Sequence, residues 1–131
     1  MNGKISLDTN IVIRLFKNDP IIIKMFATVT TVCLPIPVVA ELLFTARNSS
    51  RQKENLKIYN EFIDVCNVLD ITRETADHYS SIRLELKQQG RPIPENDLWI
   101  ASFCREQNLP LVTGDAHFDN INGLEVIKIK G

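Results

Sequence analysis

Short apolar segments alternate with longer amphipathic segments along almost the whole chain. The short ones fit strands, and the longer ones repeat their apolar residues every three or four positions, as helices do. We expect strands at residues 4–7, 31–34, 68–71, 109–113 and 124–129. We expect helices at residues 9–18, 21–29, 38–47, 51–67, 76–89 and about 95–103. Because such strands are joined by right-handed crossovers, the sequence predicts an α/β fold, a three-layer α/β/α domain around a central, mostly parallel sheet.

Proline and glycine residues mark the ends of several elements. Asp19 precedes a proline that breaks the first helix, and Asp19 can cap the second. Pro35 stops the second strand, and Pro37 is well placed in the first turn of the helix that follows. Gly90 can close the preceding helix in the left-handed conformation. We expect residues 91–94 to form an extended linker.

The size and composition are those of one ordinary globular domain. The chain has 131 residues, of which 44% are hydrophobic and 24% charged, so we expect a single domain over residues 1–131. No segment approaches the roughly 20 apolar residues of a membrane span, and no basic start leads into a long apolar segment. We therefore expect a cytoplasmic protein without membrane contact.

The three cysteines, Cys33, Cys66 and Cys104, are odd in number and far apart. They lack Cys-x-x-Cys spacing, which argues against both a disulfide framework and a thiolate zinc site. Each is expected to be a small buried apolar residue.

The net charge of −1 excludes the simplest form of nucleic-acid binding, in which the whole domain is basic. Basic residues nevertheless recur at helical spacings in three local clusters. The clusters are Arg14 with Lys17, Arg47 with Arg51 and Lys53, and Arg83 with Lys87 and Arg91. They could form basic stripes beside an acidic pocket, or they could simply be solvated helix faces.

Four acidic residues stand at the edge of an apolar segment or inside one, namely Asp8, Glu41, Asp97 and Asp115. Asp8 and Asp115 directly follow predicted strands, and the other two follow loops that leave the same end of the sheet. The ligand crevice of a parallel α/β fold lies beyond the carboxyl ends of its strands, so the topology brings the four acids together. Burying several like charges is tolerable mainly when a cation neutralises them. The sequence therefore predicts a divalent metal site.

Each acid also has a purely structural explanation. Asp8, Asp97 and Asp115 can cap helices or form turns, which is the commonest role of Asp at such positions. Glu41 lies in an apolar segment that leaves its helix almost no polar face. We expect it to point into a crevice or to pair with a base such as Arg47.

The all-oxygen ligand set, without matching His or Cys residues, favours Mg²⁺ over zinc, with Mn²⁺ as a substitute. Such ions serve phosphate chemistry, because they lower the pKa of a bound water and shield the charge of a phosphodiester. A second ion about 4 Å away could stabilise the leaving oxygen.

Four short motifs, in this order along the chain, give it a family resemblance. They are Asp8-Thr9-Asn10 after the first strand, Glu41 on a helix opened by Pro37, Asp97-Leu98-Trp99-Ile100-Ala101, and Thr113-Gly114-Asp115-Ala116-His117-Phe118. Over its whole length the chain resembles the PIN-domain ribonucleases, and it is most similar to the VapC toxins of prokaryotic toxin–antitoxin pairs. The resemblance implies Mg²⁺-dependent hydrolysis of RNA phosphodiesters that leaves 5′-phosphate and 3′-hydroxyl ends. It also implies a homodimer and inhibition by a small antitoxin that occupies the active groove.

The resemblance further implies roles for individual residues. Asp8, Asp97 and Asp115 would be metal ligands, and Glu41 would bind the metal directly or through water and help to orient or deprotonate the nucleophile. Three neighbouring residues would hold the carboxylates in place, namely Thr9, Asn10 and Thr113. Thr9 and Asn10 could equally be only the first turn of a helix. Two basic residues, Arg14 and Arg47, are the candidates for contact with substrate phosphate.

The remaining functional side chains are expected to be structural. His117 is interpreted as a packing or hydrogen-bonding residue rather than a general base. Trp99 and Phe103 could stack on unpaired bases, but their spacing on one helix favours core packing.

Two other functions remain open. A phosphatase of the haloacid dehalogenase type also has an Asp after its first strand, but this chain is short for that fold and has Asn10 where a second acid would be. A catalytically silent PIN-like binding module is the other alternative, and the presence of all four acids argues against it.

Overall fold

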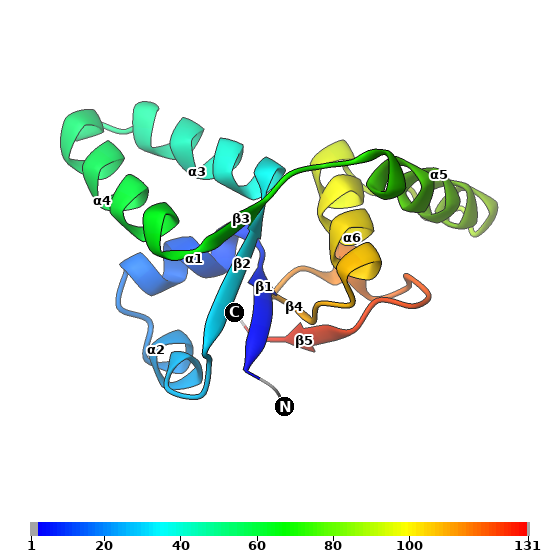
Figure 1. Cartoon of the computed structure of the whole chain (residues 1–131), viewed down its shortest axis with the longest axis horizontal. Coiled ribbons are helices and arrows are strands. Elements are labelled where there is room, and N and C mark those ends of the chain that lie inside the picture. Colours follow the sequence, from blue (N-terminus) through cyan, green and yellow to red (C-terminus); the bar gives the residue numbers. More distant parts are fainter. Residues whose placement is uncertain (1–2, 131) are drawn as a thin grey trace.

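The computed structural model describes residues 3–130 and shows a five-stranded sheet with helices on both sides (Figure 1). The strand order is β3-β2-β1-β4-β5, and every pair of neighbouring strands is parallel. The strands are β1 (Lys4–Leu7), β2 (Thr31–Pro35), β3 (Asn67–Leu69), β4 (Leu111–Thr113) and β5 (Val126–Lys128). The helices are α1 (Thr9–Phe16), α2 (Pro20–Phe26), α3 (Ile36–Arg47), α4 (Gln52–Val65), α5 (Arg73–Gln88), α6 (Glu95–Gln107) and the 3-10 helix η1 (Ala116–Phe118). The predicted three-layer α/β/α architecture is confirmed, and the sheet is parallel throughout rather than mostly parallel.

Each predicted strand and helix is present, but the last two strands are shorter than predicted. The strand predicted at residues 109–113 begins only at Leu111, because Pro110 has no N–H to donate to a neighbouring strand. The strand predicted at residues 124–129 is reduced to the three residues of β5. Both strands still carry the register that places Thr113 at the carboxyl edge of the sheet.

Local hydrogen bonds explain where the helices begin and end. The Asp19 carboxylate accepts a hydrogen bond from the backbone at the start of α2, as predicted. α5 begins earlier than the predicted residue 76, because Thr72 and Thr75 form a reciprocal capping box. After α5, Gly90 has a φ of 68°, the left-handed conformation that its position predicted.

The core lies on the faces of β1, β2 and β4 that the helices cover. The largest fully buried side chains are Phe103, Phe118, Ile5, Leu7, Ile11, Ile22, Leu34, Leu42, Ile82, Ile100, Leu111 and Val12. Each such side chain stabilises the fold by about 1.5–3 kcal/mol relative to an exposed position. Phe103 is thus a core residue, as predicted, whereas Trp99 is half-buried and stacks on Tyr79 at 4.2 Å between ring centroids.

The three cysteines are free thiols, as predicted. Cys33 and Cys104 are buried, and Cys66 is half-buried. Burial raises the pKa of Cys104 to about 12 and that of Cys66 to about 11, so both stay protonated at neutral pH. Protonated, poorly accessible thiols are inert, which agrees with a packing role.

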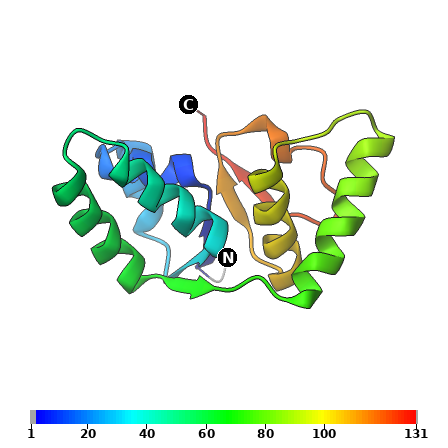
Figure 2. The same ribbon diagram turned by 90° about the horizontal axis from the view of Figure 1, so that it is seen from above.

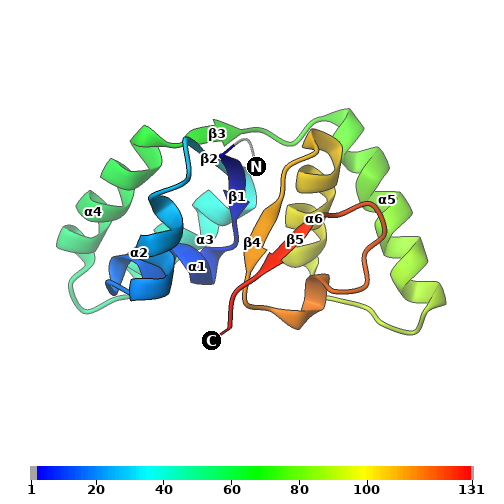
Figure 3. The ribbon, with the colours of Figure 1, turned by 90° about the horizontal axis from the view of Figure 1, so that it is seen from below.

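Two groups of helices flank the central strands. Seen from above, α1 to α4 form one group and α5 with α6 the other (Figure 2). The view from below shows β1 and β4 running between the two groups (Figure 3). α3 and α6 contact each other and join the two groups. None of the helices within residues 3–130 is long and apolar enough to cross a membrane.

Candidate active site

The four predicted acids come together in one pocket at the carboxyl edge of the sheet. Asp8 follows β1 and caps α1, and Asp115 follows β4 and caps η1. Glu41 lies on α3, and Asp97 lies in the first turn of α6. The pocket has a volume of about 410 Å³ and is lined by Asp8, Thr9, Asn10, Ile13, Glu41, Phe44, Thr45, Pro94, Asn96, Asp97, Asp115 and His117. Four acids from four distant segments therefore share one cavity.

Asp8 is the most deeply buried of these acids, with 5% of its surface exposed. Its Oδ1 accepts a hydrogen bond from the Thr9 N–H at 2.7 Å, and its Oδ2 accepts one from the Thr113 hydroxyl at 2.8 Å. Burial raises the pKa of Asp8 to about 6, and the charges of Asp97 and Glu41 also raise it, against the lowering effect of the two hydrogen bonds. Ionised Asp8 is therefore costly in this pocket unless a positive charge lies beside it.

Two of the three residues expected to hold the carboxylates, Thr9 and Thr113, form hydrogen bonds to them. The Thr9 hydroxyl donates to Glu41 Oε1 at 2.8 Å, so Thr9 joins β1, α1 and α3 at the pocket. The Thr113 hydroxyl donates to Asp8 and accepts from the Asp115 N–H at 3.0 Å, which ties the two strand ends together. Asn10 also lines the pocket, but within residues 3–130 it makes no hydrogen bond to a carboxylate.

His117 lies between two of the acids, a placement that the sequence did not predict. Its Nδ1 is 2.8 Å from Asp97 Oδ2 and 3.2 Å from Asp115 Oδ2. The hydrogen bond to Asp97 raises the pKa of His117, and burial, with the nearby acidic charges, raises the pKa of Asp97. His117 is a hydrogen-bonding residue as expected, but its partners are site acids. The sequence feature that could have indicated this position is Asp115 two residues before His117. The Asp115 Oδ1 accepts a hydrogen bond from the His117 N–H at 2.9 Å, and this turn brings the His117 ring to the pocket.

Phe44 is the second residue whose role the sequence did not reveal. In the sequence it stands within the apolar segment around Glu41, yet 66% of it is exposed and it lines the pocket. Because Phe44 follows Glu41 by three residues, the two side chains share one face of α3. That spacing was the available signal.

The two predicted phosphate contacts, Arg14 and Arg47, lie outside the pocket lining. Arg14 Nε forms an ion pair with Asp19 at 2.9 Å, and its Nη2 donates to the Lys130 carbonyl, also at 2.9 Å. Arg47 is exposed at the end of α3 and does not pair with Glu41, which is held by Thr9 instead. The roles of both arginines stay predictions.

The donor set is rich in carboxylates but is not the all-oxygen set that the sequence predicted, because His117 lies among the acids. One ligand atom from each of Asp97, Asp115 and His117 lies within 4.8 Å of the others, and Asp8 and Glu41 line the same pocket. Carboxylate oxygens are the ligands that Mg²⁺ and Mn²⁺ prefer, and burial is the main cause that raises the pKa values of Asp8 and Asp97.

Residues 5–124 match the PIN domain family. The chain belongs to this family. The match covers every acid of the pocket. It argues against the phosphatase of the haloacid dehalogenase type, which the sequence alone left open.

Known PIN-domain proteins similar to this chain carry the VapC name. Ribonuclease VapC2 of Haemophilus influenzae is 34% identical over 114 residues, which are 86% of each chain. The tRNA(fMet)-specific endonuclease VapC of Shigella flexneri is 33% identical over 124 residues, which are 92% of this chain and 94% of that one. A solved chain of the VapBC2 assembly of Rickettsia felis, bound to a DNA fragment from its promoter, has a TM-score of 0.88 and 26% identity, over 97% of this chain and 99% of that chain. The PIN domain described here is therefore a member of the VapC ribonuclease group.

Proposed function

We propose that this PIN domain is a Mg²⁺-dependent endoribonuclease, the toxin of a VapBC-type toxin–antitoxin pair. The observation that carries the proposal is the meeting of four carboxylates, from β1, α3, α6 and the end of β4, in one pocket. A second observation supports it. Burial raises the pKa of Asp8 to about 6, and two hydrogen bonds fix its carboxylate in the pocket.

The side chains divide the work by position. Asp8, Asp97 and Asp115 would hold the metal, with His117 as a neighbouring nitrogen donor. When bound, Mg²⁺ or Mn²⁺ would lower the pKa of a water and neutralise the phosphodiester. Glu41 would orient that water and accept its proton, with its Oε1 fixed by the Thr9 hydroxyl.

Thr113 acts on two ligands at once. Its hydroxyl donates to Asp8 and accepts from the Asp115 backbone, so it sets the distance between these two carboxylates. Such outer contacts fix the orientation of metal ligands.

The substrate would approach across α3. Phe44 offers an exposed ring at the rim of the pocket, where an unpaired base of RNA can stack. Arg47 lies one turn further along the same helix and remains the better placed of the two arginines for a phosphate contact, because Arg14 is engaged with Asp19.

The solved VapBC assembly supports a small antitoxin as the partner of this chain. We also propose the homodimer and the cytoplasmic location that the resemblance and the composition led us to expect. Neither affects the test of the chemistry.

The test compares cleavage of a labelled RNA by the wild type with cleavage by the Asp8→Asn and Asp97→Asn variants. Both variants should fold and should lose Mg²⁺-dependent cleavage, whereas Asp64→Asn, on the exposed face of α4, should cleave like the wild type. A phosphomonoester should stay intact in every reaction. Full activity in both variants would refute the assignment, and an inactive wild type that still binds RNA would indicate the silent binding module.

A further inference from the structure

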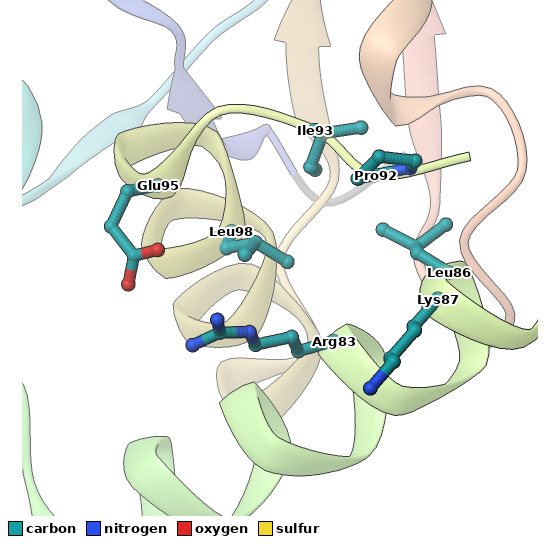
Figure 4. Close-up of a pocket in the computed structure, with 7 residues that line it drawn as sticks. All are labelled: Arg83, Leu86, Lys87, Pro92, Ile93, Glu95 and Leu98. Carbon is teal, nitrogen blue, oxygen red and sulfur yellow. The ribbon is translucent and has the colours of Figure 1, made fainter. Parts of the chain in front are cut away.

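A second pocket, with a volume of about 440 Å³, lies between α5 and α6 (Figure 4). It is lined by Arg83, Leu86 and Lys87 from α5, Pro92 and Ile93 from the linker, and Glu95 and Leu98 from α6. Leu86 and Leu98 are only 2% and 4% exposed and form its floor, so Pro92 and Ile93 supply most of its accessible apolar surface. In Figure 4 the Arg83 side chain extends from α5 towards Glu95, and the Lys87 side chain extends away from the apolar residues. The volume is in the range of pockets that bind small organic groups.

The charge of this pocket is opposite to that of the active site. Arg83 and Lys87 lie one helical turn apart and are both exposed, and Glu95 is the single acid of the lining. The Glu95 carboxylate accepts a hydrogen bond from the Tyr79 hydroxyl, to which Arg83 Nη1 also donates at 3.0 Å. Within residues 3–130 Lys87 forms no ion pair, so its charge is available to a ligand. Two cations against one acid give the lining a positive excess in a chain whose net charge is −1.

The two pockets lie on either side of the start of α6. Pro94, Asn96 and Asp97 line the active-site pocket. Ile93, Glu95 and Leu98, which alternate with them in the sequence, line the pocket between α5 and α6. A polyanion with one phosphate at the acids therefore needs to pass only the first turn of α6 to reach Arg83 and Lys87.

From this juxtaposition we infer that the pocket between α5 and α6 binds a nucleotide of the RNA that flanks the cleaved phosphodiester. The base lies against Pro92 and Ile93, and the backbone phosphate contacts Arg83 and Lys87. The inference rests on the proposed ribonuclease function. Unpaired bases are the usual targets of RNA recognition, and cations that neutralise the backbone supply much of the affinity. The positive excess and the continuity with the active site favour RNA over a protein segment as the occupant.

The first test measures the binding of a fluorescein-labelled single-stranded RNA by anisotropy. The Asp8→Asn background prevents cleavage, and the double variant Arg83→Gln/Lys87→Gln is compared with it. We expect the double variant to bind about tenfold more weakly at low salt, with a salt dependence that is shallower by about 0.7, since one phosphate contact to a single strand contributes about 0.7 to the slope. Lys24→Gln/Lys57→Gln, which removes the same charge at exposed positions of α2 and α4, is the matched control and should change binding much less.

The second test asks whether a base enters the pocket. Abasic sites are placed one at a time on both sides of the cleaved position, and one of them should weaken binding to the Asp8→Asn protein. Ile93→Trp, which fills the pocket, should remove this difference while its unfolding temperature confirms that the variant is folded.

Equal losses in the two double variants would show general electrostatics and would overturn the inference. So would an unchanged RNA affinity accompanied by weaker antitoxin binding or a changed oligomeric state, because the pocket would then belong to a protein interface. Failure of the ribonuclease proposal is distinguishable, since in that case the wild type would cleave no RNA whatever the anisotropy shows.

Discussion

Replacing Asp8 by Asn should stabilise the metal-free protein at neutral pH. Asp8 is 5% exposed, and its pKa is about 6 in the folded protein against an ordinary value of 3.8. Because the folded-state pKa is the higher of the two, the folded protein binds the proton more tightly than the unfolded chain does. Ionisation of Asp8 therefore opposes folding. At about 1.36 kcal/mol for each pKa unit, the cost is about 3 kcal/mol once Asp8 is fully ionised.

The same reasoning fixes the pH dependence. The cost is absent below the unfolded pKa of 3.8, grows as the pH rises towards about 6, and is constant above that value. The Asn variant should therefore be more stable than the wild type by about 2–3 kcal/mol at about pH 7.5, and by about 1.5 kcal/mol at about pH 5. The lower end of the range at pH 7.5 allows for the weaker hydrogen bonds that Thr9 and Thr113 would donate to the neutral Asn side chain.

The assay is urea unfolding in EDTA, followed by circular dichroism at both pH values. Asp64→Asn, at an exposed position on α4, should show no such gain, and Mg²⁺ should stabilise the wild type but not the Asp8 variant. A variant that is less stable than the wild type at neutral pH in EDTA would refute the reasoning. It would show that Asp8 acts chiefly as the cap of α1.

Three further predictions follow from single contacts. Thr113→Val removes the hydroxyl that donates to Asp8, so Mn²⁺ affinity measured by calorimetry should fall about 10–100-fold, whereas Thr28→Val, far from the pocket, should bind like the wild type. Phe44→Ala should raise the KM for RNA about tenfold with little change in kcat, since base stacking contributes about 1–3 kcal/mol. Phe44→Trp should retain the wild-type KM. An unchanged KM in the Ala variant would show that Phe44 does not contact the substrate. Arg105→Met should lower the free energy of unfolding by about 2 kcal/mol, because the guanidinium joins Glu85, His78 and the Asn122 carbonyl; a denaturation curve that overlays the wild type would contradict this.

Topology made most of the fold and the acidic part of the site predictable. Asp8 follows one strand and Asp115 follows a neighbouring strand, and the two meet because parallel strands end at the same edge of a sheet. Glu41 was predictable for a different reason, since it had no polar face of its own helix to occupy. The roles expected for Thr9 and Thr113 came instead from the resemblance to the PIN-domain ribonucleases.

The features that the sequence did not predict depend on local turns and on how the helices pack. His117 reaches Asp97 only because the Asp115 cap folds η1 back over the pocket, a turn of three residues without periodicity. Phe44 was read with its apolar neighbours, although its exposure depends on how α3 is rotated against α1 and β2. The pocket between α5 and α6 requires the packing of two helices, for which Arg83 and Lys87 gave only a helical spacing.

The way the fold holds its acids explains why a cation is needed. Asp8 is held by one backbone N–H and one hydroxyl, and Asp97 lies in the first turn of α6, where the helix dipole favours a negative charge. These contacts are neutral dipoles. The His117 side chain, 2.8 Å from Asp97, is 45% exposed, so solvent screens its interaction with the acids. Burial and mutual repulsion still raise the pKa values of Asp8 and Asp97 above their ordinary range. The fold thus fixes the carboxylates in place without neutralising them, which supports the proposal that a divalent cation binds among them and holds a phosphodiester next to Glu41.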